Sequence, residues 1–515
     1  MSLEKLIGQL LLLVLPKSYC MSEVISVSQL AWPISFSYMM EQLIPIIIMV
    51  FCGHIGEHEL AVASLGVAYC NIVVLLPIYG LSLAIDNLGS QAFGSGNLKR
   101  LGLVTQRSIV IHFILLIPAS IACWCCAPIL LYLDQDPDVT SSVEVFIWIY
   151  STGFPGFVLY SSLQKYMILQ HVVKPTILIS LLSNVATIVA CYVLIFTFNM
   201  GLSGAAWASV IAYYSQAILS IVFILYLRLP DKTWPSLSMN VFNQWGQYMK
   251  FALPSMLGVC VECWYFEIAT VAIGTLGNTQ LAVMSIIKQV SEIIYMVPMG
   301  ISSAATIRVG NSLGAGQPIT SQKMSVVAVG YAVLTSSVIG FFLFLTKNFI
   351  GKLFINDNDV VSLVSAMIPL LIISHVLDSV LGVNVAVLTG CGLQKIATPS
   401  IFVGYYLLSL PIGVILAIRK ELGVYGLMVG VVIGLIAQNC FMVYIVRNLN
   451  WSQLSIKAQK EADIDNVTLS DDLSLGNLSI IQHSANGGVT SSTTLIAKSA
   501  APLSHSLTRT ISNLE

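Results

Sequence analysis

The chain has 515 residues, of which 57% are hydrophobic and only 9% are charged, and its net charge is −1 at pH 7. A soluble domain carries about 25% charged residues, so this composition cannot cover a water-exposed surface on a chain of this length. It excludes a soluble protein, predicts one that crosses a membrane many times, and gives no support to a large nucleic-acid-binding face.

Residues 1–24 are expected to form an N-terminal cytoplasmic or interfacial segment, because the apolar run Leu6–Leu15 is too short to cross a bilayer. Apolar segments of spanning length, each near the roughly 20 residues that a transmembrane helix needs, follow in order. We place twelve of them near 26–51, 60–84, 103–128, 142–163, 177–198, 204–227, 251–273, 281–304, 324–346, 361–388, 399–418 and 424–446. Lipid offers the backbone no hydrogen-bond partners, so every span should be a helix.

An internal repeat relates the two halves of the chain. Pro33 matches Pro254 at an offset of 254 − 33 = 221, and the same offset pairs Gly53–Gly56 with Gly274–Gly277. It also pairs the acidic stretch 135–139 with 356–360, and Gly-rich stretches near 94 and 314 match at 220. Each repeat holds an even number of spans, so the two halves enter the membrane in the same direction, as parallel repeats related by an axis along the membrane normal.

The expected fold is therefore an all-α polytopic membrane protein with twelve transmembrane helices in two pseudo-symmetric six-helix bundles. Its parts are an N-terminal lobe over 25–228, a cytoplasmic linker over 229–249 and a C-terminal lobe over 250–447. Residues 448–515 are rich in Ser, Thr and Asn and are expected to form a disordered cytoplasmic tail.

Lys and Arg residues set the orientation. With the N-terminus in the cytoplasm, twelve of them fall on inner loops or their margins (Lys99, Arg100, Arg107, Lys165, Lys174, Arg228, Lys232, Lys250, Arg308, Lys323, Lys395, Arg447) and four on outer loops (Lys347, Lys352, Arg419, Lys420). This excess predicts that both termini face the cytoplasm. We expect a multi-pass protein of the plasma membrane.

Carboxylates at membrane depth are the candidate functional groups. Glu262 and Glu267 lie within the apolar stretch 253–271, where an uncompensated charge is expensive and for that reason usually functional. Asp378 lies in the tenth span, and Glu41 in the first span is the repeat equivalent of Glu262. The alternative for all four is that they are satisfied core groups. Asp378 has His375 one turn earlier as a private partner, and Glu41 can hydrogen-bond backbone near Pro45.

Lys288 and Glu292 lie one helical turn apart in the eighth span and can form a local structural ion pair. The aromatic residues Trp264, Tyr265 and Phe266 stand beside the carboxylates. They can either line a cation site or face lipid.

No motif for nucleotide, metal or haem binding and no catalytic nucleophile stands out. Gly-rich turns at 89–97 and 310–317 lack the Lys-Ser/Thr end and the preceding strand of a phosphate-binding loop. We therefore expect a transporter with no cofactor, powered by an ion gradient, and not an enzyme.

Several motifs, in the same order along the chain, resemble those of the multidrug and toxic compound extrusion family, in its animal branch of organic cation/proton antiporters. They are Phe51–Gly56, Gly89–Gly94, Gln135–Asp138, Tyr295–Pro298 and Arg308–Gly316. The resemblance covers residues 24–447 and implies two six-helix lobes around a central cleft.

The resemblance also implies which side chains bind cargo and protons. The seventh-span carboxylates of the family fall on Glu262 and Glu267, the tenth-span acid on Asp378 and a second-span Asn on Asn71. The eighth-span Glu of the animal branch falls on Gln289, and this chain has Glu292 nearby instead. With Glu41, Trp264 and Tyr295 these residues complete the candidate substrate and proton site.

The predicted function is alternating-access exchange of protons for small organic cations and xenobiotics, by a monomer in the lipid bilayer that binds no nucleic acid. The alternatives are sodium coupling through Glu41 and its neighbours, a lipid or glycolipid flippase, and a channel or receptor, which the two-lobe repeat disfavours.

Overall fold

The structure, a computed structural model, describes residues 21–132, 135–236, 239–355 and 357–462. The N-terminal lobe contains α2 (Met21–Ile55), α3 (Glu57–Cys70), η1 (Asn71–Leu75), α4 (Leu76–Gly94), α5 (Leu98–Trp124), α6 (Cys126–Tyr132), α7 (Pro137–Ser151), α8 (Phe154–Leu169), α9 (Lys174–Cys191), η2 (Tyr192–Thr197) and α10 (Gly201–Tyr226). The linker holds α11 (Pro230–Thr233) and η3 (Met239–Phe242). The C-terminal lobe contains α12 (Trp245–Gly274), α13 (Asn278–Gly314), α14 (Pro318–Ile350), η4 (Gly351–Leu353), α15 (Asn358–Gly390), α16 (Gln394–Phe402), η5 (Val403–Ser409), α17 (Leu410–Val414), η6 (Ile415–Arg419) and α18 (Gly423–Arg447).

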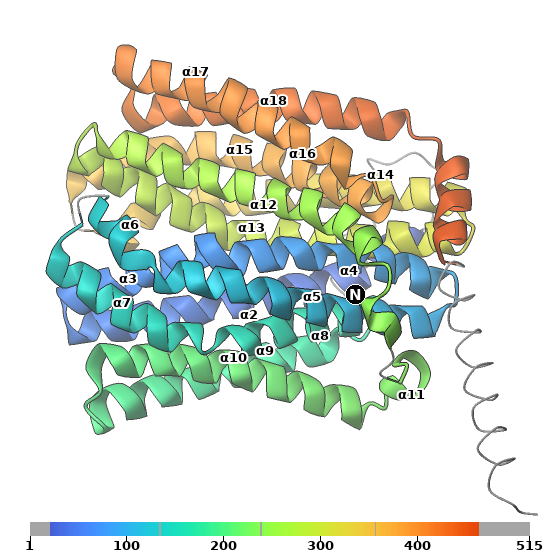
Figure 1. Ribbon diagram of the computed structural model, residues 1–515. Coiled ribbons are helices and arrows are strands. Elements are labelled where there is room, and N and C mark those ends of the chain that lie inside the picture. Colours follow the sequence, from blue (N-terminus) through green and yellow to red (C-terminus); the bar gives the residue numbers. More distant parts are fainter. Residues whose placement is uncertain (1–20, 133–134, 237–238, 356, 463–515) are drawn as a thin grey trace, which may run out of the picture. The chain divides into compact units, whose positions relative to one another are not determined.

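These elements form the expected set of spans. Among the described residues, eleven helical segments are long and apolar enough to cross a membrane, and α7 and α8, bent by 48° at their junction, count as a twelfth when the pair is taken as one broken span. The helices run side by side along a common direction (Figure 1). The prediction of an all-α membrane fold with twelve spans is confirmed.

The repeat is visible in how the helices begin. The Asp136 side chain caps α7 by accepting hydrogen bonds from the backbone N–H groups of Asp138 (2.8 Å) and Val139 (3.4 Å). Asp357, at an offset of 357 − 136 = 221, caps α15 in the same way. Such caps satisfy backbone donors that have no partner within the helix. The acidic stretches that match between the halves are therefore equivalent helix starts.

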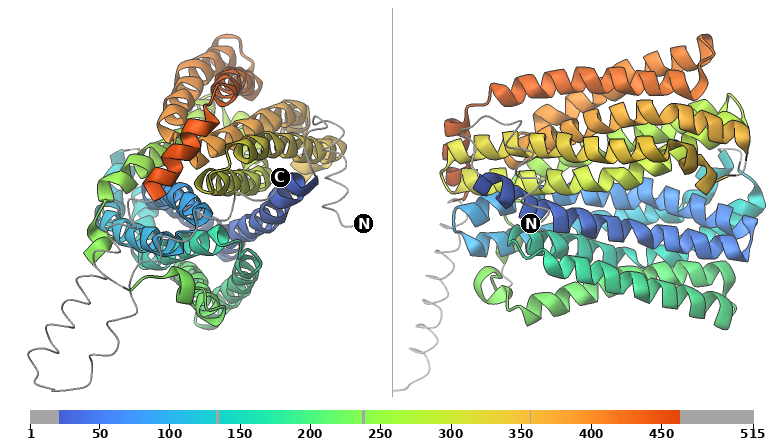
Figure 2. Two further views of the ribbon diagram at one scale, coloured as in Figure 1. Left: turned by 90° about the vertical axis from the view of Figure 1, so that its right-hand side faces the viewer. Right: turned by 180° about the vertical axis from the view of Figure 1, so that it is seen from behind.

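The two lobes share a core at one end and separate toward the other. One apolar cluster combines residues of both lobes with Trp451 and Ala458, near the described chain ends and the linker. A second cluster contains only N-terminal-lobe residues between Ile44 and Ala212, and a third only C-terminal-lobe residues between Tyr265 and Met442. In the end view of Figure 2 the orange helices lie at the top and the green helices at the bottom, with the yellow and blue helices side by side between them. We call the shared end the terminal end and the opposite end the far end.

Close backbone contacts join the lobes at the terminal end, and they come in reciprocal pairs. Gly94 packs against the backbone of Asn311, with no room for a Cβ atom, and Gly314 packs in the same way against Gln91. Gly94 and Gly314 are repeat equivalents, as are Gln91 and Asn311, because 314 − 94 and 311 − 91 both equal 220. Ser90 meets its own equivalent, Gly310, between the two contacts. This pattern is the isologous contact that a two-fold axis generates, here within one chain.

A second reciprocal pair lies further along the same helices. Gly80 on α4 packs against the backbone of Met256 on α12, and Gly300 on α13 packs against Ser35 on α2. Met256 is the repeat equivalent of Ser35 at 221, and Gly300 that of Gly80 at 220. We call these contacts together the glycine seam. They confirm that the repeats are parallel copies related by an axis between the lobes.

Hydrogen bonds reinforce the seam at the terminal end. The side chain of Gln91 donates to the carbonyl of Gly390 (3.0 Å), and Arg308 donates to the carbonyl of Ser26 (3.0 Å). His171 Nε2 lies 3.0 Å from the side-chain amide of Asn311. Burial, together with the nearby charge of Arg308, lowers the pKa of His171 to about 4. The ring is therefore neutral at physiological pH and adds no repulsion across the seam.

Residues 451–462 are helical, so this part of the expected disordered tail is an ordered helix. The Asn450 side chain accepts from the backbone N–H of Gln453 (3.1 Å), and Trp451 and Ala458 enter the shared core. The helix touches both lobes, since Ser455 donates to Leu313 O (3.1 Å) and Asn97 donates to the carbonyl of residue 462 (3.1 Å). Buried residues recur every three to four positions along this helix, which is the spacing of one helical face. The overall composition of the tail is polar and gives no sign of this short pattern. The rest of the tail, from residue 463, and most of the N-terminal segment lie outside the described residues.

Replacing Ala458 with Asp is expected to lower the thermal unfolding midpoint by several degrees. Ala458 is buried, so the new carboxylate would be taken out of water without a partner. Lys460→Asp places an acid on the exposed face of the same helix and should leave the midpoint unchanged. The measurement is thermal unfolding of the purified protein in detergent. Equal midpoints for the two variants would show that the helix does not depend on this packing.

Candidate functional site

A polar cluster of the C-terminal lobe brings together two of the predicted carboxylates. Glu262 on α12 and Asp378 on α15 lie close enough to interact electrostatically. The Tyr405 hydroxyl on η5 donates to Asp378 Oδ1 (3.5 Å) and also contacts the Glu262 carboxylate. Among the residues that the structure describes, neither acid has a Lys, Arg or His in an ion pair with it. Three separate helical elements thus converge on two acidic groups joined by one phenol.

Aromatic side chains hold this pair in place. Tyr405 is buried and its ring centroid lies 4.8 Å from that of Tyr265, whose hydroxyl hydrogen-bonds Ser409 (2.7 Å). The predicted residue Tyr295 on α13 interacts electrostatically with both acids, and the bare Cα of Gly382 leaves space for its hydroxyl. These contacts fix the tyrosines as neighbours of the two acids.

The aromatic residues beside the carboxylates divide between two environments. Tyr265 points into the lobe, whereas the side chain of Trp264 is 38% exposed. Adjacent residues on a helix point about 100° apart, so the two cannot share one surface. The interpretation of Tyr265 as a lining residue is supported by its packing on Tyr405, and a lining role for Trp264 stays a prediction.

The second acidic group of α12, Glu267, forms an ion pair with a lysine. Lys288 Nζ on α13 lies 2.5 Å from Glu267 and 4.0 Å from Glu292. The expected local pair of Lys288 with Glu292 is therefore the longer of two contacts, and the shorter one crosses between helices. All three side chains are partly exposed, at 24% for the lysine and 42% and 43% for the acids.

The remaining predicted residues lie around this cluster or away from it. His375 is buried without a partner for Nε2 in the described structure, so it is not the private partner of Asp378. Gln289 is half-buried on α13 beside Lys288. Asn71 opens the π-helical turn η1 in the N-terminal lobe, and its side chain is exposed.

Glu41 belongs to a separate polar group inside the N-terminal lobe. Its carboxylate accepts hydrogen bonds from the Tyr160 hydroxyl (2.6 Å) and the Gln164 amide (2.5 Å) on α8. Ser37 (3.1 Å) and Ser180 (3.4 Å) donate to the same oxygen. These partners of Glu41 are side chains. The alternative, that Glu41 hydrogen-bonds backbone near Pro45, is not what the structure shows. The structure does not bring Glu41 to the C-terminal cluster, although the two occupy equivalent positions of the repeat.

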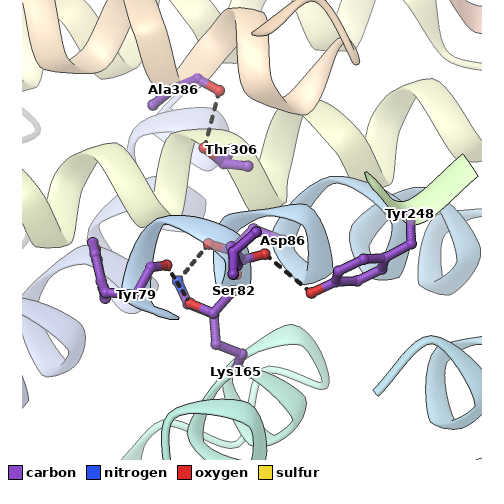
Figure 3. A network of polar contacts seen from close by, with 8 residues as sticks. Tyr79, Ser82, Asp86, Lys165, Tyr248, Thr306 and Ala386 are labelled. Carbon is purple, nitrogen blue, oxygen red and sulfur yellow. Dashed lines mark hydrogen bonds and ion pairs between the residues drawn. The ribbon is translucent and has the colours of Figure 1, made fainter. Parts of the chain in front are cut away.

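An ion pair in the N-terminal lobe was not predicted from the sequence. Lys165 on α8 donates to Asp86 on α4 at 2.5 Å, and the side chains are only 3% and 4% exposed (Figure 3). The Lys165 ammonium also lies over the Tyr79 ring, 5.4 Å from its centroid. Asp86 and Lys165 fall just beyond the ends of the predicted spans 60–84 and 142–163. An acid and a base at the ends of two spans of one lobe are the pattern from which this ion pair could have been predicted.

The C-terminal cluster lies on the far side of the contacts between the lobes. Helix α12 meets the N-terminal lobe at Met256, α13 at Val297 and Gly300, and α15 at Gly390. The charged residues follow Met256 on α12 (Glu262, Glu267), precede Val297 on α13 (Lys288, Glu292) and precede Gly390 on α15 (Asp378). They therefore occupy the part of the C-terminal lobe in which its apolar core is separate from that of the other lobe.

The sequence matches a known protein family twice along its length. The MatE family model matches residues 33–193 and again 254–415, two stretches that begin 254 − 33 = 221 residues apart. Human multidrug and toxin extrusion protein 1 is 35% identical over 440 residues, covering 84% of this chain and 76% of the relative. Mouse multidrug and toxin extrusion protein 2 is 33% identical over 447 residues, covering 86% of this chain and 77% of the relative.

Solved structures of MATE transporters share this fold. The eukaryotic MATE transporter AtDTX14 superposes with a TM-score of 0.82 at 27% identity, over 86% of this chain and 99% of that one. The Vibrio cholerae MATE transporter VcmN in its bent form has the same fold at 16% identity, with a TM-score of 0.73 over 86% of this chain and 98% of that one. The duplicated match, the two-lobed helical fold and the identity to animal relatives show that the chain is a membrane transporter, not an enzyme, and belongs to the MATE family of multidrug and toxin extrusion proteins.

Proposed function

We propose that this transporter exchanges protons for small organic cations, and that Glu262 and Asp378 carry both in turn. The observation that supports the proposal is that two acids from different helices converge without an ion-pair partner in the described structure, joined by the Tyr405 hydroxyl. An unpaired carboxylate at membrane depth is unfavourable unless a proton or another cation neutralises it. A proton and an organic cation then compete for the same negative charge, which couples their movements.

The arrangement of the lobes supplies the alternation. In this structure the glycine seam and a shared apolar core close the terminal end, while the lobes have separate cores toward the far end. With both termini in the cytoplasm, as the distribution of Lys and Arg predicts, the protein is in its outward-facing state. Protonation from outside releases the cargo. Breaking the seam and joining the lobes at the far end then exposes the acids to cytoplasmic cations.

Two alternatives make different predictions. Sodium coupling would use Glu41, where the hydroxyl oxygens of Tyr160, Ser37 and Ser180 surround one carboxylate, an oxygen-rich set that suits a hard cation. A flippase for anionic lipids needs a free basic group at membrane depth. Lys288 is engaged by Glu267 and Glu292, so this alternative has less support.

Transport in proteoliposomes tests the proposal. We expect uptake of radiolabelled tetraethylammonium to rise with an outward-directed proton gradient, and to stay unchanged when sodium is replaced by potassium at fixed pH. Uptake that follows a sodium gradient without a pH gradient would instead favour the Glu41 site. Equal uptake with and without either gradient would contradict coupled exchange altogether.

We propose further that the protein acts as a monomer in the plasma membrane. Both bundles that form the transport path belong to one chain, so no second copy is needed to complete it. Impermeant cysteine labelling from either side of the membrane tests the predicted cytoplasmic position of the termini.

A further inference from the structure

Lys288 is partly exposed, whereas Lys165, the lysine that pairs with an acid in the N-terminal lobe, is buried. Lys165 and Asp86 are almost fully enclosed, at 3% and 4% exposure, as expected for a pair that is part of the packing. Lys288 pairs with Glu267 at the same 2.5 Å, yet these two side chains are 24% and 42% exposed. An exposed pair adds little to the stability of a fold. The Lys288 ammonium is therefore better explained by what it does to ligands than by what it does to folding.

The charges around Lys288 divide into two subsites. Glu262 and Asp378 share Tyr405 and have no lysine or arginine partner in the described structure. Glu267 and Glu292 share Lys288. Glu262 and Glu267 are five residues apart on α12, about 7.5 Å along the helix axis and about 140° around it. The subsite of Glu262 and Asp378 thus has no cation of the protein beside it in the described structure, whereas the subsite of Glu267 and Glu292 already contains the ammonium group of Lys288.

We propose that Lys288 is a specificity-determining residue that fills the second subsite with a tethered ammonium group, so that the transporter accepts singly charged organic cations and rejects doubly charged ones. A tethered group competes at an effective concentration that dilute solutes cannot match. A ligand with a second positive charge near Glu267 would have to displace Lys288 and would meet its like charge, which is how negative design excludes a competitor.

The proposal rests on the proposed organic-cation function, and it makes a specific chemical prediction. Without the lysine, Glu267 becomes a second carboxylate that has no cationic partner in the described structure. Because Glu262 and Glu267 point to different sides of α12, only a dication with well-separated positive charges could contact both acids. Methyl viologen, a bipyridinium with two quaternary nitrogens, has this form, and 1-methyl-4-phenylpyridinium is its singly charged analogue of nearly the same size.

The test is equilibrium binding of these two probes to purified full-length protein, measured by titration calorimetry at one fixed pH, which requires no proton gradient. Lys288→Gln is expected to tighten methyl viologen binding about tenfold or more relative to the wild type. Binding of the monocation should change less than about threefold. Lys288→Arg keeps the charge and should keep the wild-type ratio of the two affinities. Lys347→Gln removes a lysine of α14 that lies outside the cluster, and it is the matched control.

A double variant separates the tethered-cation effect from general loss of charge or structure. Lys288→Gln combined with Glu267→Gln removes the freed carboxylate together with the lysine, so the ratio should return to the wild-type value. An unchanged ratio in Lys288→Gln would overturn the proposal, and so would a double variant that keeps the single variant's preference for the dication. If the ratio shifts as expected while proteoliposomes show no proton-driven exchange, the coupling proposed above fails and the selectivity role stands.

Discussion

Replacing Glu262 with Gln is expected to abolish proton-driven exchange of organic cations while leaving the protein folded. Glutamine has almost the shape of the glutamic acid side chain, and it keeps a hydrogen-bonding partner for Tyr405, but it can neither lose a proton nor carry a negative charge. Removing one partner of a desolvated charge contact weakens it by about 2 kcal/mol or more, so cation affinity should fall about thirtyfold or more. The same outcome is expected for Asp378→Asn, because both acids contact the Tyr405 hydroxyl.

The measurement is uptake of tetraethylammonium driven by an outward-directed proton gradient, normalised to the amount of inserted protein. Glu57→Gln is the matched control, since it neutralises an exposed acid in the first turn of α3, far along the chain from the cluster. Wild-type uptake in both Glu262→Gln and Asp378→Asn would show that these acids carry neither the cargo nor the proton.

Replacing Asp86 with Asn is expected to destabilise the protein by about 3–5 kcal/mol, the effect of leaving one charge of a buried ion pair without its partner. The ammonium of Lys165 is almost fully enclosed, so water cannot take the place of the carboxylate. Adding Lys165→Met to Asp86→Asn removes the stranded charge and keeps the side-chain volume, and most of the stability should return. Thermal unfolding of the purified variants in detergent gives both values.

The other lobe shows that this position in the fold does not require charges. Thr306 is the repeat equivalent of Asp86 at 220, and Ala386 that of Lys165 at 221. There the Thr306 hydroxyl donates to the carbonyl of Ala386 (2.9 Å), as Figure 3 shows beside the ion pair. A double variant as unstable as Asp86→Asn alone would mean that the charges stabilise the N-terminal lobe through more than each other.

The fold could be predicted largely from the sequence, because lipid restricts the chain to helices of a fixed length and because the repeat supplies a second copy of each signal. The matched acidic stretches at 135–139 and 356–360 prove to be equivalent helix caps. Composition misled the prediction at 451–462, where a helix in polar sequence is held by tertiary contacts of Trp451 and Ala458 that no local window contains.

The candidate site could be predicted from the sequence only in part. Spacing along a helix identifies an acid at membrane depth, but it does not identify the partner, which comes from another helix. Glu262 and Asp378 were both predicted, yet nothing in the sequence indicated that Tyr405 joins them. Lys288 was assigned to its neighbour in sequence, Glu292, whereas its shorter contact is to Glu267 on α12. Partner choice depends on helix rotation and packing, which hydrophobic periodicity specifies only coarsely.

The self-complementary form of the glycine seam has a consequence for the history of the molecule. Contacts that pair Gly94 with Asn311 and Gly314 with Gln91 have the self-complementary form of an interface between two identical copies, as expected if both halves derive from one duplicated six-helix unit. Within one chain the two halves need not be alike. The C-terminal half places four acids and a lysine in its far portion, while the N-terminal half encloses the pair of Lys165 and Asp86. Substitutions in the far portion of one half can therefore change its charges without disturbing the seam that both halves share.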